Sequence, residues 1–236
     1  MTLPVHVRVG TYNLHGMRAG LAALAPVVVA LRADVLCVQE VPRFVRWRAR
    51  RGALAASAGL AVATHGRVGG VAVLTGPRMR VLHAEHHALR PFRGLERRAL
   101  ALAVVEPVGD GGRLVVGSFH LDLDEAARAY HVEEIIALME DAAARHDASI
   151  VLGGDLNEQD HQPAWRHMAA RLADCHAEAP AGGGPTFRSP RPRRRIDAVF
   201  AAREIAVVSC GVPLTGTDQA GASDHFPVVA ELRVGH

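Results

Sequence analysis

The sequence predicts an α/β protein in which two mixed β-sheets pack face to face, with helices on their outer surfaces. Two observations lead to this prediction. Patterns typical of strands are mixed with fewer helical patterns along the chain. A weak repeat of strand, polar loop, helix and strand also occurs once in each half, and ends at Glu40 and at Asp155. A duplicated unit with more strands than helices favours a four-layer sandwich, because each sheet must bury both faces.

The first half of the chain alternates between strand and helix patterns. Residues 5–14 alternate apolar and polar side chains, which predicts a strand, and the apolar spacing over 21–31 predicts a helix. A short apolar run at 34–40 predicts a buried strand that ends in the acid Glu40. An arginine-rich helix is expected over 41–58. Further strands, separated by Gly and Pro, are expected at 60–64, 69–75, 79–88 and 97–106.

The second half contains the clearest helix and an unusually long loop. The helix is predicted over 124–144, with Asp124 as its N-cap and an apolar stripe along one side. Residues 181–195 are rich in Gly, Pro and Arg and are too long for a simple turn, which favours a functional loop. Strands are expected at 113–121, 149–153, 196–201, 204–210 and 226–234.

The composition is that of an ordinary globular protein, and we expect a cytoplasmic location. The chain has 236 residues, of which 49% are hydrophobic and 22% charged, and we expect one domain over 1–236. Its 3 cysteines lack CxxC spacing, which argues against a zinc ribbon or a disulfide framework and suits a reducing compartment. The apolar run 19–31 is too short to span a bilayer. We therefore expect no stable membrane association and no obligate protein partner.

The positive charge is carried by arginine alone, since lysine is absent. The formal net charge is only +3, which does not by itself indicate a nucleic-acid-binding protein. Two runs concentrate arginine, one over 43–51 and one over 188–195. Runs of this kind are more often solvated surface than binding sites.

Five short motifs place polar side chains where predicted strands end, and Asp197 precedes another strand. The only two asparagines of the chain, Asn13 and Asn157, both belong to these motifs. The motifs are Thr-Tyr-Asn13-Leu-His, Val-Gln-Glu40, Ser-Phe-His120-Leu-Asp, Gly-Gly-Asp155-Leu-Asn157 and Ser-Asp224-His225-Phe-Pro.

Each motif alone is ambiguous. An acid such as Glu40 at a strand end is usually solvated. In Gly-Gly-Asp-Leu-Asn the glycines permit a tight turn, while Asp155 and Asn157, two apart on an extended chain, project from the same side. Its alternative interpretation is an Asx-turn capping the next helix. Ser-Asp-His places a carboxylate beside an imidazole, but a surface loop would explain it equally well.

Together, the order, spacing and strand-end placement of the motifs resemble the endonuclease/exonuclease/phosphatase superfamily. That superfamily includes DNase I-like nucleases, exonuclease III-like repair enzymes, neutral sphingomyelinases and inositol polyphosphate 5-phosphatases. The resemblance covers residues 7–232, essentially the whole chain. It implies a DNase I-like fold and the hydrolysis of phosphate esters.

The same residues suit metal-assisted hydrolysis. Cleaving a phosphodiester requires water to reach an anionic phosphorus and charge on the leaving oxygen to be stabilised. A hard divalent cation held by a few carboxylates and waters provides that stabilisation. Glu40 with Asn13, supplemented by Asp224, is an oxygen-rich set that suits Mg²⁺, with Mn²⁺ as a possible substitute. The resemblance implies that Glu40 is the principal ligand.

His225 and Asp197 are predicted to form the acid–base pair, because a carboxylate on one ring nitrogen fixes the tautomer and favours imidazolium. By resemblance, Asp155 orients or deprotonates the attacking water, Asn157 holds that water or a phosphate oxygen, and His120 binds the phosphate. Whether His225 acts as the base or as an electrostatic clamp stays open.

Three arginines are candidates for contact with the substrate phosphate: Arg98, Arg188 and Arg195. A structural role for Arg98 is an equal alternative, whereas Arg128 is expected to be structural. His15 departs from the superfamily pattern, because repair nucleases often carry an acid there. This departure leaves a second metal ligand in doubt.

The sequence therefore predicts a Mg²⁺-dependent phosphodiesterase acting on DNA or RNA. The arginine loop leads directly into Asp197 and would flank the pocket, although Phe187 is its only aromatic residue. The alternative is a phosphatase or phosphodiesterase of small molecules such as inositol phosphates or lipid headgroups. A non-catalytic binding module on the same scaffold is disfavoured, because Glu40, Asp155, Asp197 and His225 are all present.

Overall fold

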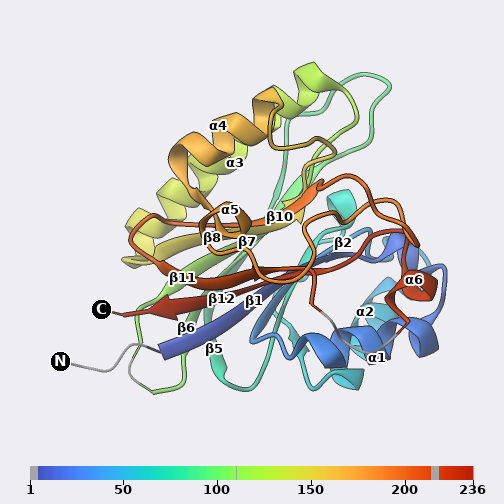
Figure 1. The fold of residues 1–236 in the computed structure, drawn as a ribbon, viewed down its shortest axis with the longest axis horizontal. Coiled ribbons are helices and arrows are strands. Elements are labelled where there is room, and N and C mark those ends of the chain that lie inside the picture. The colour runs from blue at the N-terminus through green and yellow to red at the C-terminus, as the bar shows by residue number, and fades with distance from the viewer. Residues whose placement is uncertain (1–4, 110, 214–217, 236) are drawn as a thin grey trace.

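The computed structural model describes residues 5–109, 111–213 and 218–235. Two six-stranded mixed sheets pack face to face, and helices cover the outer face of each sheet (Figure 1). This arrangement confirms the four-layer α/β sandwich that the sequence predicts.

The two sheets are called sheet A and sheet B below. Sheet A has the order β11 (Ala206–Gly211), β12 (Val228–Val234), β1 (Val5–Asn13), β2 (Val35–Gln39), β4 (Ala72–Thr75) and β3 (Ala61–Val62). Sheet B has the order β5 (Met79–Ala88), β6 (Ala99–Pro107), β7 (Leu114–His120), β8 (Ser149–Asp155), β10 (Asp197–Ala201) and β9 (Ala173–Asp174).

The internal repeat is present as one parallel strand pair in each sheet. In sheet A, β1 and β2 are parallel and are joined by α1 (Leu21–Leu31). In sheet B, β7 and β8 are parallel and are joined by α3 (Glu125–His146). Both pairs are flanked by antiparallel strands. Because parallel strands end at the same edge of a sheet, each unit delivers its polar residues to one edge.

Three hydrophobic cores hold the layers together. The largest lies between the sheets and is built from inward-facing Val, Ala and Cys side chains. A second lies between sheet B and the helices α3 and α4 (Pro163–Arg171). The third lies between sheet A and the helices α1 and α2 (Trp47–Ser57). Two short helices, α5 (Cys175–Glu178) and α6 (Gln219–Ala222), complete the fold.

Helix α3 follows the sequence prediction closely. Asp124 is the N-cap, and its side chain accepts a hydrogen bond from Ala127 N at 2.9 Å. Val132, Ile135 and Met139 are fully buried and pack in the core beneath the helix. Apolar residues at this spacing form one face of a helix, so this sequence pattern fixes which side of α3 covers sheet B.

The two glycines before Asp155 have a structural role that differs from the tight turn predicted for them. Gly153 and Gly154 lie within β8, and neither is among the residues with positive φ. A Cβ on Gly153 would lie 3.0 Å from Cys37 Cβ of the opposite sheet, and one on Gly154 would lie 2.5 Å from Phe119 O. The prediction of a tight turn was wrong. These glycines allow the two sheets, and two strands of sheet B, to approach closely beside the site.

Several predicted boundaries also change. Residues 41–46 are not helical, and α2 begins only at Trp47, after Arg46 in the left-handed region. Pro42 disfavours helical geometry at the residue before it and so opposes an earlier start. Residues 68–70 form a short 3₁₀ helix, so β4 begins at Ala72 and not at the predicted position 69. Helix α4 was not predicted, although Pro163 at its start is a typical first helical residue.

The cysteines and the helix lengths can be described directly. Cys37, Cys175 and Cys210 are buried and free. In the part of the chain that the structure describes, no helix has both the length and the apolar character needed to cross a membrane.

Candidate active site

Strand ends from both sheets, together with the segment between α6 and β12, bring the motif residues together. The prediction that the Ser-Asp224-His225 motif ends a strand was wrong, because it precedes β12. In sheet B, His120 and Asp197 lie on either side of Asp155 in the strand register, which makes one row across β7, β8 and β10. In sheet A, Asn13 ends β1, and Glu40 directly follows β2. Asn13 connects the two sheets, since its Nδ2 donates to Asp155 Oδ2 at 3.0 Å and to Glu40 Oε1 at 3.2 Å.

Asp155 lies at the centre of this group and is only 1% exposed. Its Oδ1 accepts a hydrogen bond from Asn157 N at 2.9 Å, with Asn157 in the left-handed region. An Asx-turn is therefore present and the chain is not extended here, but Asp155 does not cap the next helix, because α4 begins only at Pro163. Burial, together with the negative charge of Asp197, raises the pKa of Asp155. A carboxylate in this environment is a stronger base than one in water.

His120 is held as a neutral imidazole. Asn157 Nδ2 donates to Leu121 O at 3.0 Å and to His120 Nε2 at 3.1 Å, so Nε2 acts as an acceptor. Burial, helped by the charges of Arg98 and His225, lowers the pKa of His120 to about 4, although Asp155 opposes the shift. The Nε2 atom lies 3.4 Å from Asp155 Oδ2.

His225 and Asp197 form the ion pair that the sequence predicts. The distance from His225 Nδ1 to Asp197 Oδ2 is 2.9 Å, and both side chains are buried. His225 Nε2 lies 3.7 Å from Asp155 Oδ2. Burial alone would lower the pKa of His225, but the carboxylates of Asp197, Asp155 and Asp224 raise it to about 10. The pair therefore favours an imidazolium whose orientation is fixed by Asp197.

Two hydroxyl groups that sequence reasoning missed position this pair. Thr186 Oγ1 accepts backbone hydrogen bonds from Ile196 at 3.2 Å and from Asp197 at 3.3 Å. Ser223 Oγ accepts from His225 N at 3.2 Å and donates to Asn13 O at 2.7 Å. The only available signal was the place of Ser223 in the Ser-Asp-His motif. Thr186 gave none, because a threonine in a Gly/Pro-rich loop is not distinctive.

Glu40 and Asp224 supply further carboxylate oxygen atoms to the group. Both line the same cleft as Asp155 and His225. Asp224 Oδ1 is buried and makes no hydrogen bond among the described residues, although His15 Nδ1 lies 3.4 Å away. A buried carboxylate oxygen without a donor is costly, and a hard cation would satisfy it. The donor set thus fits the metal that the motifs predict.

Asn13 fits the ligand prediction less directly. Its Oδ1 accepts a hydrogen bond from His15 N at 3.0 Å, so the amide nitrogen, not the oxygen, faces Glu40 and Asp155. To act as a ligand beside Glu40, the amide would have to turn over and lose its bond to His15. In the structure, Asn13 instead joins the two carboxylates as a hydrogen-bond donor.

A second set of atoms that could bind a metal belongs to three buried residues. One atom each from Asp155, Asp197 and His225 lie within 4.8 Å of one another, close enough for a metal ion. However, His225 Nδ1 and Asp197 Oδ2 already bond to each other. A metal ion bound there would have to replace this hydrogen bond.

The site opens into a cleft of about 810 Å³. Its floor includes His120, Asp155 and His225. Its rim carries exposed apolar side chains, with Phe44 75% exposed and Leu123 77% exposed. The arginines that line it are Arg18, Arg43, Arg50 and Arg98.

The three arginines predicted to contact phosphate have different positions. Arg98 is buried and lines the cleft, while its Nε donates to Asp122 at 3.1 Å; it therefore has a structural bond, and its contact with phosphate stays a prediction. Arg188 is exposed, with Nε 3.9 Å from Asp224 Oδ2, and lines a smaller neighbouring pocket. Arg195 bonds Asp174 and Asp160, each at 2.9 Å, and does not line the cleft. The structure therefore corrects the prediction for Arg195.

The arginines of the 43–51 run were underestimated. Arg43 and Arg50 line the cleft, although the run was interpreted as solvated surface. Their position directly after Glu40 in the sequence was the signal that could have indicated this. In the 181–195 loop, by contrast, Phe187 lines the cleft, with its ring centroid 4.7 Å from that of His225. Arg128 is structural as expected, because its Nε donates to Glu158 at 2.8 Å.

Comparison with known proteins agrees with this geometry. The model of the Endonuclease/Exonuclease/phosphatase family matches residues 10–225, so the chain belongs to that family. Members of the family are hydrolytic phosphoesterases, and this chain is therefore a hydrolase of phosphate esters. No curated protein matches the sequence significantly.

Solved structures share the fold. A family protein of Bacteroides thetaiotaomicron is 20% identical, with a TM-score of 0.82 and full coverage of both chains (100% each). A family protein of Beutenbergia cavernae is 26% identical, with a TM-score of 0.75 over 98% of this chain and 72% of that chain. A mannosyl-6-phosphatase of B. thetaiotaomicron is 18% identical, with a TM-score of 0.80 over 96% of this chain and 99% of that chain.

Proposed function

We propose that this protein is a Mg²⁺-dependent phosphodiesterase that cleaves nucleic acid. The observation that supports this most is that two sets of ionisable groups lie in one cleft. Asp155 and the His225–Asp197 pair are buried, while Glu40 and Asp224 are half-buried and present further carboxylates, and Asn13 donates to both Asp155 and Glu40. This arrangement suits attack of water on phosphorus, which needs a base for the water and a cation for the leaving oxygen.

Glu40 and Asp224 would hold the metal, with waters completing the coordination. When bound, Mg²⁺ supplies positive charge that stabilises the leaving oxygen, and Mn²⁺ is expected to substitute. The two carboxylates come from different segments of the chain, so the complete fold is needed to bring them to one cleft. Asn13 contributes by holding Glu40 against Asp155.

Asp155 accepts the proton of the attacking water in this proposal. It sits where a water in the cleft can reach it, and Asn13 and Asn157 fix both of its oxygens. His225 presents Nε2 towards the same space, while Asp197 holds Nδ1 and prevents the ring from turning. We therefore assign His225 to stabilising the negative charge on the phosphate. Asn157 and the neutral His120 are assigned to orienting the water and a phosphate oxygen.

The rim of the cleft supports a polyanionic substrate with aromatic groups. Arg18, Arg43 and Arg50 give it positive charge that can follow a phosphate backbone. The exposed side chains of Phe44 and Leu123 offer apolar contacts for bases at the same rim. A single small phosphate ester would leave this surface uncovered.

A phosphatase of small molecules is the second candidate. Arg43 and Arg98 both line the cleft and would suit a phosphomonoester equally well. The mannosyl-6-phosphatase described above has the same fold over nearly all of both chains, which makes this candidate worth testing.

Paired chromogenic substrates separate the two candidates. We expect hydrolysis of bis(p-nitrophenyl) phosphate, little hydrolysis of p-nitrophenyl phosphate, and cleavage of plasmid or single-stranded DNA or RNA in Mg²⁺ that EDTA abolishes. Preference for the monoester, with no cleavage of any nucleic acid, would replace the first proposal by the second. Activity that persists in EDTA would contradict the metal-dependent mechanism.

A single domain and a cytoplasmic location stay predictions.

A further inference from the structure

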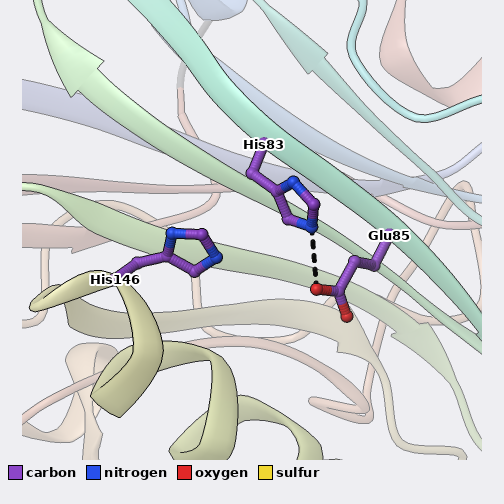
Figure 2. A group of neighbouring side chains, drawn as sticks. All are labelled: His83, Glu85 and His146. Carbon is purple, nitrogen blue, oxygen red and sulfur yellow. Dashed lines mark hydrogen bonds and ion pairs between the residues drawn. The ribbon is translucent and has the colours of Figure 1, made fainter.

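A second group of metal-binding side chains lies on the edge strand of sheet B. Alternate residues of a strand face the same side, so β5 directs His83, Glu85 and His87 together. The last residue of α3, His146, lies over them. Figure 2 shows the imidazoles of His83 and His146 and the carboxylate of Glu85 turned towards one another between the strand and the helix end.

The ligand atoms are already close. His83 Nε2 lies 2.9 Å from Glu85 Oε1, and one ligand atom from each of His83, Glu85 and His146 lie within 4.8 Å of one another. The two imidazole rings are stacked, with centroids 5.0 Å apart. Zinc-bound nitrogen and oxygen atoms lie about 2.0–2.2 Å from the ion, so small rotamer adjustments would bring these atoms into coordination distance.

Glu85 is the anionic centre of the group. Despite partial burial, hydrogen bonds from Arg145, His87 and His83 lower its pKa to about 2. His87 Nε2 lies 2.6 Å from Oε2, which leaves Oε1 to face His83 and the helix end. His87 thus holds the carboxylate by its other oxygen, as outer-shell partners of metal ligands commonly do.

The converging atoms already attract a cation from the protein itself. Arg145 donates from NH2 to Glu85 Oε1 at 2.8 Å and from NH1 to His146 Nε2 at 3.4 Å. The lone pair of His146 Nε2 therefore points into the group. The Nε atom of Arg145 also donates to Asp141 Oδ2 at 2.9 Å. Arg145 is partly exposed and can keep this bond to Asp141 while leaving the other two atoms to an ion.

We propose that His83, Glu85 and His146 bind a transition-metal ion of the Zn²⁺ type, with His87 positioning the carboxylate and Arg145 competing for the site. Two imidazoles and one carboxylate form a nitrogen-rich set that selects Zn²⁺, Ni²⁺ or Cu²⁺ over Mg²⁺. The site in the cleft presents oxygen atoms instead, so the two sites select different ions. A bound ion would link the edge strand β5 to the end of α3, and this role does not depend on the reaction in the cleft.

The test is calorimetric titration of the full chain with Zn²⁺ in excess Mg²⁺, which occupies the oxygen-rich site. We expect His83→Ala and His146→Ala each to weaken Zn²⁺ binding by about tenfold or more, since even outer-shell changes cost 10–100-fold. Arg145→Met should strengthen binding, because the competing guanidinium is removed. The matched control is His161→Ala, an exposed histidine outside both sites, which should change nothing.

Crystals soaked in Zn²⁺ locate the ion independently. The proposal requires an anomalous-scattering peak between His83, Glu85 and His146. A peak confined to the cleft, or equal Zn²⁺ affinity in wild type, His83→Ala and His146→Ala, would overturn it. Weaker binding by Arg145→Met would remove the proposed competition. The four substituted side chains, those of His83, Arg145, His146 and His161, are at least partly exposed. The thermal unfolding midpoint of each variant without metal should therefore stay within about 2 °C of wild type, which would show that the variant is folded.

Discussion

The two halves of the molecule share a topology but give their acids different environments. Glu40 follows the second parallel strand of sheet A, and Asp155 ends the second parallel strand of sheet B. Glu40 is half-buried at the cleft, whereas Asp155 is 1% exposed and lies among other ionisable groups. A carboxylate that keeps contact with water suits a hydrated cation, while a desolvated one suits proton transfer. The fold places both acids, and their surroundings determine what each can do.

Removing the buried imidazole of His225 should have the largest effect on the rate of hydrolysis. We expect His225→Ala to lower kcat on bis(p-nitrophenyl) phosphate by about 10²–10⁴, the usual cost of losing a positioned acid–base or charge-stabilising group. His161→Ala serves as the matched control, because that side chain is exposed and outside the cleft. A His225→Ala rate within a factor of three of wild type would exclude this residue from the mechanism.

The second prediction concerns the half-buried Glu40 and the amount of metal that activity requires. Glu40→Gln keeps the size of the side chain and removes its charge, so the Mg²⁺ concentration for half-maximal activity should rise by about 10–100-fold. Glu133→Gln, on the exposed face of α3, is the control and should leave the requirement unchanged. If titration of activity against Mg²⁺ gives the same midpoint for Glu40→Gln, the ligand assignment fails.

The close contact between the two sheets can be tested by adding a methyl group to it. In Gly153→Ala the new methyl group would meet Cys37 Cβ at 3.0 Å and Sγ at 3.1 Å. We expect this overpacking to lower the free energy of unfolding by about 1–3 kcal/mol in urea titrations. Gly52→Ala, in α2 with no atom within 4 Å of the new Cβ, should instead raise it by about 0.5–1 kcal/mol. Equal effects would mean that the sheets can separate at little cost.

The smallest expected effect distinguishes the two arginine runs. Replacing Arg43 and Arg50 with alanine should reduce the slope of log affinity for DNA against log salt by about 1 for each phosphate that is no longer neutralised. Replacing Arg191 and Arg193, exposed and outside the cleft, should leave the slope unchanged. The reverse result would restore the sequence-based expectation that the 188–195 loop holds the nucleic acid.

The sequence predicted those features that depend on strand ends and regular periodicity. His120 and Asp155 lie at one cleft because their motifs end neighbouring parallel strands, whereas His225 reaches the same cleft from the segment before β12. The apolar stripe and the N-cap of α3 were also predicted from the sequence. Such features are local in sequence, so a pattern of a few residues carries them.

Features that depend on distant partners were not predictable. Arg195 is turned away from the cleft by Asp160 and Asp174, which no local pattern links to it. The amide of Asn13 faces two carboxylates because His15 N holds its oxygen. The need for Gly153 appears only when Cys37 of the other sheet lies against it. In each case the deciding interaction forms only after the chain has folded.

The position of β12 has a consequence for synthesis of the protein. This strand pairs with both β1 and β11 in sheet A, yet it is made after every other strand that the structure describes, and His225 precedes it by only a few residues. A nascent chain on the ribosome therefore carries β1 with one side unpaired until β12 has been made. A chain that stops before His225 would lack both the neighbour of β1 and the imidazole of the site, so it would be inert and prone to degradation.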